Sequence, residues 1–266
     1  MKRRMVFDQN PMGYDRYRPG YVKELFDEIF RYAGLNASMR VLEIGIGTGL
    51  ATLPILEAGC SVTAVEPGKN LASYASIKFR AHKNFKAVCC DFEDFEPDER
   101  YDLIYSATAF HWIPEEAGFP KIYRLLKPGG AVALFWNRPF VARTDDPLHM
   151  DIQNLYQKYG LSDALPVEFS EKDCRKTLDA LERYGFSDIK VQLFHRTRTM
   201  SAEDYIGLLS TYSDHVSMEK DDWHKFAGEV MAAINTRGGV IRIYDTMDLY
   251  LARTGGSEEA QLGGLI

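Results

Sequence analysis

An α/β fold with a mostly parallel sheet is the architecture that this sequence predicts, and three observations predict it. Short apolar runs alternate with amphipathic helical patterns along most of the chain. One of these runs ends in a cluster of glycines that opens a helix. The composition, 45% hydrophobic and 26% charged over 266 residues, is typical of a globular chain that can bury a large core.

The first half of the chain alternates regularly between the two patterns. A helical spacing of apolar side chains over residues 20–33 precedes a first strand at 39–44. The elements expected after it are a helix at 50–58, a strand at 61–65, a helix at 69–81, strands at 85–90 and 101–107, a helix at 115–126, a turn at 127–130 and a strand at 131–136. Strands that alternate with helices form a parallel sheet covered on both faces.

The second half continues the alternation more loosely. Its expected elements are helices at 147–159 and 171–184, a strand at 189–194, a helical stretch at 202–234 and a strand at 240–251. Because no long linker interrupts them, we expect a single domain over residues 1–254 with a helical cap insertion at about 201–236. The Gly-rich, acidic tail at 255–266 is expected to fray.

Charge and cysteine usage argue against several classes of protein. The 38 acidic residues exceed the 32 basic ones, the net charge is −6, and the basic residues are scattered, which disfavours binding to nucleic acid. No run approaches the roughly 18 apolar residues of a membrane helix. The four cysteines (60, 89, 90 and 174) and the six histidines lack metal-ligand spacing. We therefore expect a cytoplasmic protein with reduced thiols and no metal.

The glycine cluster is the most informative segment. A strand leads into Gly45-Ile46-Gly47-Thr48-Gly49, where backbone without side chains can approach a ligand at a helix start. The dinucleotide fingerprint spaces its glycines as G-x-G-x-x-G, whereas the third glycine here comes one residue earlier. Glu43 precedes the cluster and would repel a diphosphate but attract an ammonium or sulfonium group. The charge therefore favours a cationic cofactor over a purely structural turn.

Acidic residues also follow the next two strands. Glu66 ends the second strand, where a carboxylate can accept both hydroxyls of a ribose. Asp91-Phe92 closes the third, where the carboxylate could accept a hydrogen bond from an adenine amino group while the ring or backbone of Phe92 borders the base. Each acid alone is equally well explained as a solvated turn residue. Three acids at the ends of three successive strands favour a common ligand.

Four motifs in order resemble the class I S-adenosylmethionine-dependent methyltransferases, and the likeness covers residues 7–138. They are Glu43 to Gly49, Glu66-Pro67, Asp91-Phe92 and Leu125-Leu126-Lys127-Pro128-Gly129-Gly130. Within that class, Phe7-Asp8, Tyr14 to Pro19 and Ala109-Phe110-His111-Trp112 resemble the small-molecule branch that includes trans-aconitate methyltransferase-like proteins.

The resemblance implies a Rossmann-like, doubly wound, seven-stranded sheet with a reversed last strand, and S-adenosylmethionine as the cofactor with S-adenosylhomocysteine as the product. It implies that the glycines at 45, 47 and 49 lie under the methionine part, that Glu66 with Pro67 binds the ribose, and that Asp91 and Phe92 border the adenine. Tyr14, Tyr17 and Arg18 are expected over the cofactor, where Arg18 either meets its carboxylate or is a surface charge. The helical stretch departs from the family pattern, and we expect it to cap the site and select the acceptor.

Methyl transfer from a sulfonium is an in-line displacement, which requires alignment and exclusion of water. A carboxylate acceptor is already ionised at pH 7, whereas a hydroxyl or amine benefits from a base. His111, after the fourth strand, is the only candidate base or acceptor-binding residue, with Trp112 as a wall; the alternative for His111 is a packed structural role. Ser106, with its neighbours Tyr105 and Thr108, is expected to line the cofactor or acceptor pocket.

Three hypotheses follow. The first is transfer of a methyl group to a small molecule by a monomer or homodimer; the segment after the fourth strand lacks the Asn/Asp-Pro-Pro-aromatic signature of base-amine methylation. The second is a non-catalytic protein that binds the cofactor and uses the helical stretch for a partner. The third, a nicotinamide-dependent oxidoreductase, is disfavoured by the glycine spacing.

Overall fold

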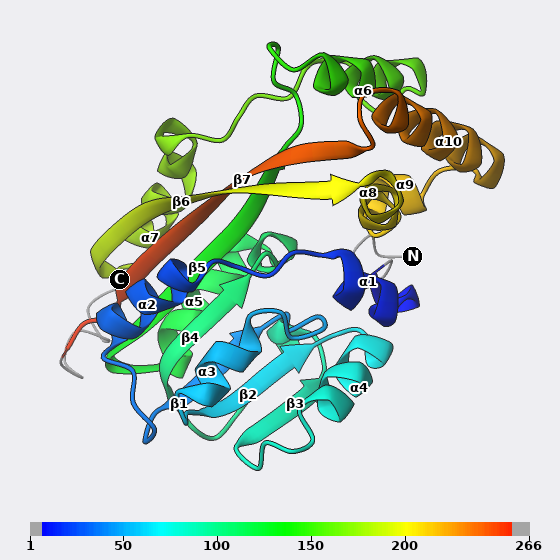
Figure 1. Cartoon of the computed structure of the whole chain (residues 1–266). Helices are drawn as coiled ribbons and strands as arrows, with labels where there is room; N and C mark the ends of the chain where they lie inside the picture. The colour runs from blue at the N-terminus through cyan, green and yellow to red at the C-terminus, as the bar shows by residue number, and fades with distance from the viewer. Residues whose placement is uncertain (1–6, 257–266) are drawn as a thin grey trace. The chain divides into compact units, whose positions relative to one another are not determined.

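The computed structural model describes residues 7–256, and this part of the chain contains one seven-stranded sheet with the strand order β3-β2-β1-β4-β5-β7-β6 (Figure 1). Six strands are parallel, and the last one, β7, runs antiparallel between β5 and β6. The predicted Rossmann-like sheet with a reversed last strand is therefore confirmed. The predicted tail lies outside the described residues from residue 257 onward.

The strands are β1 (Arg40–Ile44), β2 (Ser61–Glu66), β3 (Phe85–Cys89), β4 (Tyr101–Ala107), β5 (Leu126–Phe140), β6 (Ser187–Ser201) and β7 (Val240–Arg253). The α-helices are α1 (Pro11–Tyr17), α2 (Lys23–Ala33), α3 (Thr52–Glu57), α4 (Lys69–Lys78), α5 (Glu115–Leu125), α6 (Pro147–Lys158), α7 (Arg175–Arg183), α8 (Ala202–Leu209), α9 (Ser213–Val216) and α10 (Lys220–Thr236). Short 3₁₀ turns occur at η2 (Phe92–Asp94), η3 (Phe110–Trp112) and η4 (Glu171–Cys174). None of the helices in residues 7–256 is long and apolar enough to cross a membrane.

The chain divides into two compact units, which are described separately. The sheet unit comprises 20–137, 170–194 and the described residues from 247 onward; the helical unit comprises the described residues up to 19, 138–169 and 195–246. The predicted insertion at 201–236 thus shares its unit with α1 and α6. The assignment of residues 1–254 to a single domain stays a prediction.

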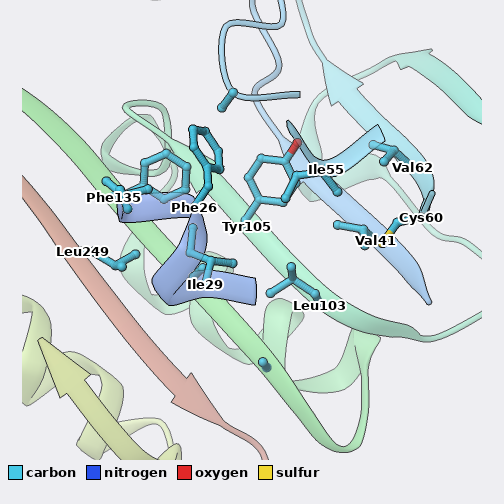
Figure 2. Close-up of a cluster of buried hydrophobic side chains, with 14 of the residues drawn as sticks. Phe26, Ile29, Val41, Ile55, Cys60, Val62, Leu103, Tyr105, Phe135 and Leu249 are labelled. Carbon is cyan, nitrogen blue, oxygen red and sulfur yellow. The ribbon is translucent and has the colours of Figure 1, made fainter. Parts of the chain in front are cut away.

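The core of the sheet unit covers both faces of the parallel strands. On one face, Phe26 and Ile29 of α2 pack with Val41, Tyr105 and Phe135 of the strands, and Figure 2 shows these side chains in one cluster. The neighbouring strand residues, such as Leu42 and Ile104, are also fully buried and project to the opposite face because side chains alternate along a strand. Burial on both faces explains the near-continuous apolar runs in the sequence.

The register of these strands brings their carboxyl ends to one edge. Glu43 of β1 lies opposite Ala64 of β2 and Tyr105 of β4, and Glu66 of β2 lies opposite Cys89 of β3. Open parallel sheets bind ligands at this edge, since the loops after the strands converge there. The glycine loop, Glu66 and Asp91, which lie at or after the ends of β1, β2 and β3, therefore share one edge of the sheet unit.

The helical unit has its own apolar core. Tyr205 and Leu208 of α8 pack with Phe226 of α10, Ile152 of α6 and Ile243 of β7. α6 begins where its residue types favour a helix start: Pro147 occupies the first turn, and the preceding Asp146 accepts a hydrogen bond from the N–H of Leu148 at 2.9 Å.

Two predicted elements were wrong in detail. The turn expected at 127–130 is an irregularity inside β5, because Tyr101 of β4 lies opposite Leu126 while Leu103 lies opposite Ala131, and Gly129 takes a φ of 75°. The helical stretch expected at 202–234 is broken into α8, α9 and α10. Helix α1, which carries the Tyr14 and Tyr17 motif, was not predicted as a helix.

Candidate active site

The glycine loop after β1 has three glycines with positive φ: 72° at Gly45, 57° at Gly47 and 78° at Gly49. A Cβ at Gly45 would lie 2.4 Å from the Cβ of Ala109, and one at Gly49 would lie 2.3 Å from the ring of Phe79, so both positions are closed by packing. A Cβ at Gly47 would meet nothing within 4 Å. Gly47 is therefore the glycine whose backbone stays open to a ligand, as a cofactor above this loop requires.

Glu66 ties the glycine loop to the loop after β2. Its Oε2 accepts the N–H of Gly47 at 2.9 Å and its Oε1 accepts the N–H of Gly68 at 2.9 Å, while its side chain is almost fully buried. A carboxylate offers about four acceptor positions, and these two N–H groups take one on each oxygen. The half-buried Pro67 lies between these anchors. The arrangement fits a cofactor with two ribose hydroxyls at the open face of Gly47.

Glu43 is enclosed at the end of β1. Only 1% of its surface is exposed, and its Oε2 accepts the hydroxyl hydrogen of Thr52 at 2.7 Å. Burial raises the pKa of Glu43 to about 7, with the nearby Glu66 adding to the shift, while the hydrogen bond from Thr52 opposes it. Glu43 is thus poised near its titration point at neutral pH, and a cation placed beside it would favour the ionised form.

Asp91 and Phe92 follow β3 as predicted, but their side chains differ in environment. Asp91 precedes the 3₁₀ turn η2 in an extended backbone conformation and is partly exposed. The ring of Phe92 is buried, with the Lys121 ammonium 5.4 Å from its centroid. Of the two alternatives for Phe92, the enclosed ring favours the backbone as the neighbour of a base; contact of either residue with adenine stays a prediction.

The end of β4 is fixed by two hydroxyl groups. The fully buried Ser106 donates to the carbonyl of Ile44 at 2.9 Å and so ties β4 to β1. Thr108 takes a φ of 55°, which is rare for a β-branched residue, and its hydroxyl oxygen lies 2.7 Å from the hydroxyl of Tyr21 and accepts the N–H of Asn137 at 3.2 Å. Strain of this kind persists where the surrounding structure enforces it and is common at active sites.

His111 is exposed on the short turn η3 that follows this strained residue. Its Nδ1 lies 3.0 Å from Nε1 of Trp136, and its ring centroid lies 5.0 Å from that of the half-buried Trp112. An indole N–H can only donate, so Nδ1 of His111 must accept, and the neutral ring carries its proton on Nε2. In this tautomer Nε2 is a hydrogen-bond donor, and Nδ1, the basic nitrogen, accepts the hydrogen bond from Trp136.

Tyr14, Tyr17 and Arg18 lie in the helical unit. Arg18 donates from Nε to the Thr211 hydroxyl and from Nη2 to the Thr211 carbonyl, both at 2.8 Å, and its guanidinium lies 5.1 Å from the Tyr14 ring centroid. The ring of Tyr17 packs on α8, where a Cβ at Gly207 would lie 2.4 Å from it. These contacts account for Tyr14, Tyr17 and Arg18 within their own unit, and their contact with the cofactor stays a prediction.

Sequence reasoning therefore located the residues at the carboxyl edge of the sheet unit but missed their supports. Thr52, Thr108 and Trp136 hold Glu43, the end of β4 and His111 in place. Only Thr108 stood in a segment that the motif analysis had singled out. The support from Trp136 pairs residues 25 apart in the chain, and no local pattern marks it.

Known proteins resemble this chain over the segment that carries the candidate site. The family model described as a methyltransferase domain matches residues 41–130, which span the glycine loop, Glu66, Asp91 and His111. An uncharacterized methyltransferase of Schizosaccharomyces pombe is 26% identical over 87% of this chain and 88% of its own length. A malonyl-[acyl-carrier protein] O-methyltransferase of Acetivibrio thermocellus is 26% identical over 70% of this chain and 68% of its own.

Solved structures share the fold. A protein of Anaeromyxobacter dehalogenans assigned as a type II methyltransferase superposes with a TM-score of 0.66 at 21% identity, covering 91% of this chain and all of its own. Phosphoethanolamine N-methyltransferase 2 of Haemonchus contortus, in complex with phosphomonomethylethanolamine and S-adenosylhomocysteine, gives a TM-score of 0.55 at 16% identity; 93% of this chain covers 57% of that protein. With the open glycine loop and its carboxylates, these findings identify the chain as a class I S-adenosylmethionine-dependent methyltransferase.

Proposed function

We propose that this methyltransferase acts on a small molecule and methylates one of its oxygen atoms, with a carboxylate as the preferred acceptor. The observation that carries the proposal is the hydrogen bond from Trp136 to Nδ1 of His111, which makes Nδ1 an acceptor and so places the proton of the exposed ring on Nε2. A donor can hold an anionic oxygen, but it cannot remove a proton from a hydroxyl or an ammonium group. A carboxylate needs no proton removed at pH 7.

The protein's part in the reaction is then alignment and exclusion of water. When bound, S-adenosylmethionine supplies an electrophilic methyl group on a sulfonium centre. The backbone at Gly47, the carboxylate of Glu66 and the carboxyl of Glu43 are the groups that we propose to hold the cofactor, through hydrogen bonds and charge. His111 and Trp112 are proposed to orient the acceptor oxygen, and correct orientation alone can remove much of the barrier to a displacement.

The named relatives fix neither the class nor the atom of the acceptor, since one is named for a malonyl group on an acyl-carrier protein and one structural neighbour for phosphoethanolamine. One relative is named as an O-methyltransferase and one structural neighbour as an N-methyltransferase. The net charge of −6 supports a small acceptor over nucleic acid. We also propose the rest of the predicted cofactor contacts, at Tyr14, Tyr17 and Arg18, and an acceptor-selecting role for residues 201–236 in a cytoplasmic monomer or homodimer.

The acceptor atom is tested with cofactor labelled in its methyl group and a panel of small carboxylic acids, phenols and amines. Mild base releases the label of a methyl ester as volatile methanol, whereas methyl ethers and methylamines retain it. We expect base-labile label on a carboxylic acid. Base-stable label on a phenol or an amine as the main product would contradict the proposal.

The role of His111 is tested by two replacements. His111→Gln keeps an N–H donor near the position of Nε2, and His111→Phe removes it. We expect the Gln variant to retain most of kcat and the Phe variant to raise the acceptor KM about tenfold, as loss of a charge-assisted hydrogen bond predicts. A Gln variant as inactive as the Phe variant, with the pH dependence of kcat abolished, would assign a base instead.

A further inference from the structure

The helical unit contains a cavity, partly open to solvent, that none of the predicted site residues explains. Its volume is about 210 Å³. Its walls come from β5, α6, α8, β7 and the segments that follow β5, α6 and α8, and they include the aliphatic residues Val141, Leu208 and Ile243 and the tyrosines 156, 205 and 212. A dry apolar cavity of about 150 Å³ is large enough to bind benzene. This cavity therefore has room for a six-membered ring with a short substituent, or for a chain of a few carbons.

The three tyrosines bring hydrogen-bond donors to this wall. Burial raises the pKa of Tyr156, Tyr205 and Tyr212, so all three phenols stay protonated at neutral pH. The hydroxyls of Tyr156 and Tyr205 interact with each other. Tyr212 is partly exposed, so its hydroxyl can donate a hydrogen bond to the acceptor group of a ligand.

The charges around Tyr212 decide which acceptor fits. The guanidinium of Arg18 lies 4.2 Å from the ring centroid of Tyr212, and both its hydrogen bonds go to the uncharged Thr211. Arg198 interacts electrostatically with Tyr205 and Tyr212. These two cations stand beside the donor wall of the cavity.

Carboxylates near Tyr212 offset this positive charge only in part. The fully buried Asp245 is shared by Arg198, at 2.6 Å, and by Arg196, at 2.8 Å. Asp214 is half exposed and lies 3.4 Å from Nδ1 of His215. With Arg18 added, the surroundings of Tyr212 are positive, so an anion is favoured and a cation is disfavoured in spite of the aromatic rings.

We propose that this cavity binds a compact organic anion, a ring or short alkyl chain ending in a carboxylate, with the apolar body against Val141, Leu208 and Ile243 and the carboxylate beside the hydroxyl of Tyr212. Binding in this cavity is independent of methyl transfer.

The test is calorimetric titration of the full chain with benzoate and hexanoate, and with benzyl alcohol and benzylamine as the neutral and cationic matches of benzoate. We expect benzoate to bind at least tenfold more tightly than benzyl alcohol and benzylamine to bind weakest. Val141→Phe fills the cavity and should abolish binding of every probe. Tyr212→Phe keeps the ring under Arg18 and should weaken benzoate about tenfold while changing benzyl alcohol by less than threefold.

Two controls keep the outcomes separate. Val191→Phe makes the same change at an exposed position of β6 in the sheet unit and should leave benzoate binding unchanged. Titration with S-adenosylhomocysteine shows whether each variant is folded and whether the methyltransferase site works, so that its failure is distinct from failure of the cavity. Equal binding of benzylamine and benzoate, unchanged binding in Val141→Phe, or no binding of any probe to a chain that binds S-adenosylhomocysteine would overturn the proposal.

Discussion

Replacement of Glu43 by Gln should make the protein more stable at alkaline pH, and the gain should grow with pH. Glu43 is 1% exposed, and burial raises its pKa from 4.5 to about 7. A carboxyl group whose pKa is higher in the folded than in the unfolded chain stabilises the folded chain less when it is ionised than when it is protonated. Its contribution is therefore present at low pH and is lost as pH rises from about 4.5 through 7. The glutamine is isosteric, keeps an acceptor for the Thr52 hydroxyl and never ionises.

The size of the effect follows from the two pKa values. The difference of about 2.5 pKa units corresponds to about 3 kcal/mol of unfolding free energy when the carboxyl is fully ionised. Most of this, roughly 2 to 3 kcal/mol, develops between pH 5 and pH 8. Removing the charge by Glu43→Gln should recover that amount relative to the natural chain.

The assay is urea denaturation of both proteins at pH 5 and pH 8, with the exposed Glu57 of α3 as the matched site. Glu57→Gln should shift the unfolding free energy by less than 0.5 kcal/mol at either pH, as is usual for surface substitutions. The reasoning is refuted if Glu43→Gln shifts the unfolding free energy by the same amount at both values of pH.

Three further predictions concern the loop, the histidine and the helical unit. Gly47→Ala should cost about 1 kcal/mol of stability, because φ is 57° there, but should weaken S-adenosylhomocysteine binding more than tenfold, because its Cβ enters the open space; binding that falls no more than stability would contradict this. Trp136→Phe frees Nδ1 of His111 and should raise the acceptor KM about fivefold with the cofactor affinity unchanged, measured by steady-state kinetics; an unchanged KM would refute the positioning role. Asp245→Asn removes the carboxylate that Arg196 and Arg198 share and should cost about 3 kcal/mol in urea denaturation; a loss below 1 kcal/mol would show that the cluster is solvated.

The parallel half of the fold could be predicted because each of its elements is marked by a pattern of neighbouring residues in the sequence. Strand β4 begins and ends at the predicted residues, and β1, β2 and β3 differ by one residue at an end, since buried runs bounded by turn residues mark them. The long strands β5, β6 and β7 exceed their predicted ranges because they extend by pairing with distant segments. That pairing leaves no periodic signal in the chain itself.

The candidate site could likewise be predicted only in part from the sequence. The glycines and the acids at strand ends could be predicted because a parallel sheet gathers such ends at one edge. The environment of each acid could not: Glu43 faces Thr52 in the interior, whereas Glu66 bridges two loops. The narrower likeness to trans-aconitate methyltransferase-like proteins stays a prediction, and so does the role of His111, whose tautomer depends on Trp136.

The measurement that tests the account most directly is calorimetric titration of the chain with S-adenosylhomocysteine, with NAD as the control and Glu66→Gln as the variant. Glu66 accepts hydrogen bonds from the N–H groups of Gly47 and Gly68. The amide of glutamine can accept only one of them, because its NH₂ group then faces the other N–H. We expect one S-adenosylhomocysteine site per chain, affinity for it weakened at least tenfold by Glu66→Gln, and no binding of NAD. At 100 times Kd, S-adenosylhomocysteine should raise the unfolding free energy by about 2.7 kcal/mol. Binding of NAD in place of S-adenosylhomocysteine, or equal affinity in the variant, would contradict the account.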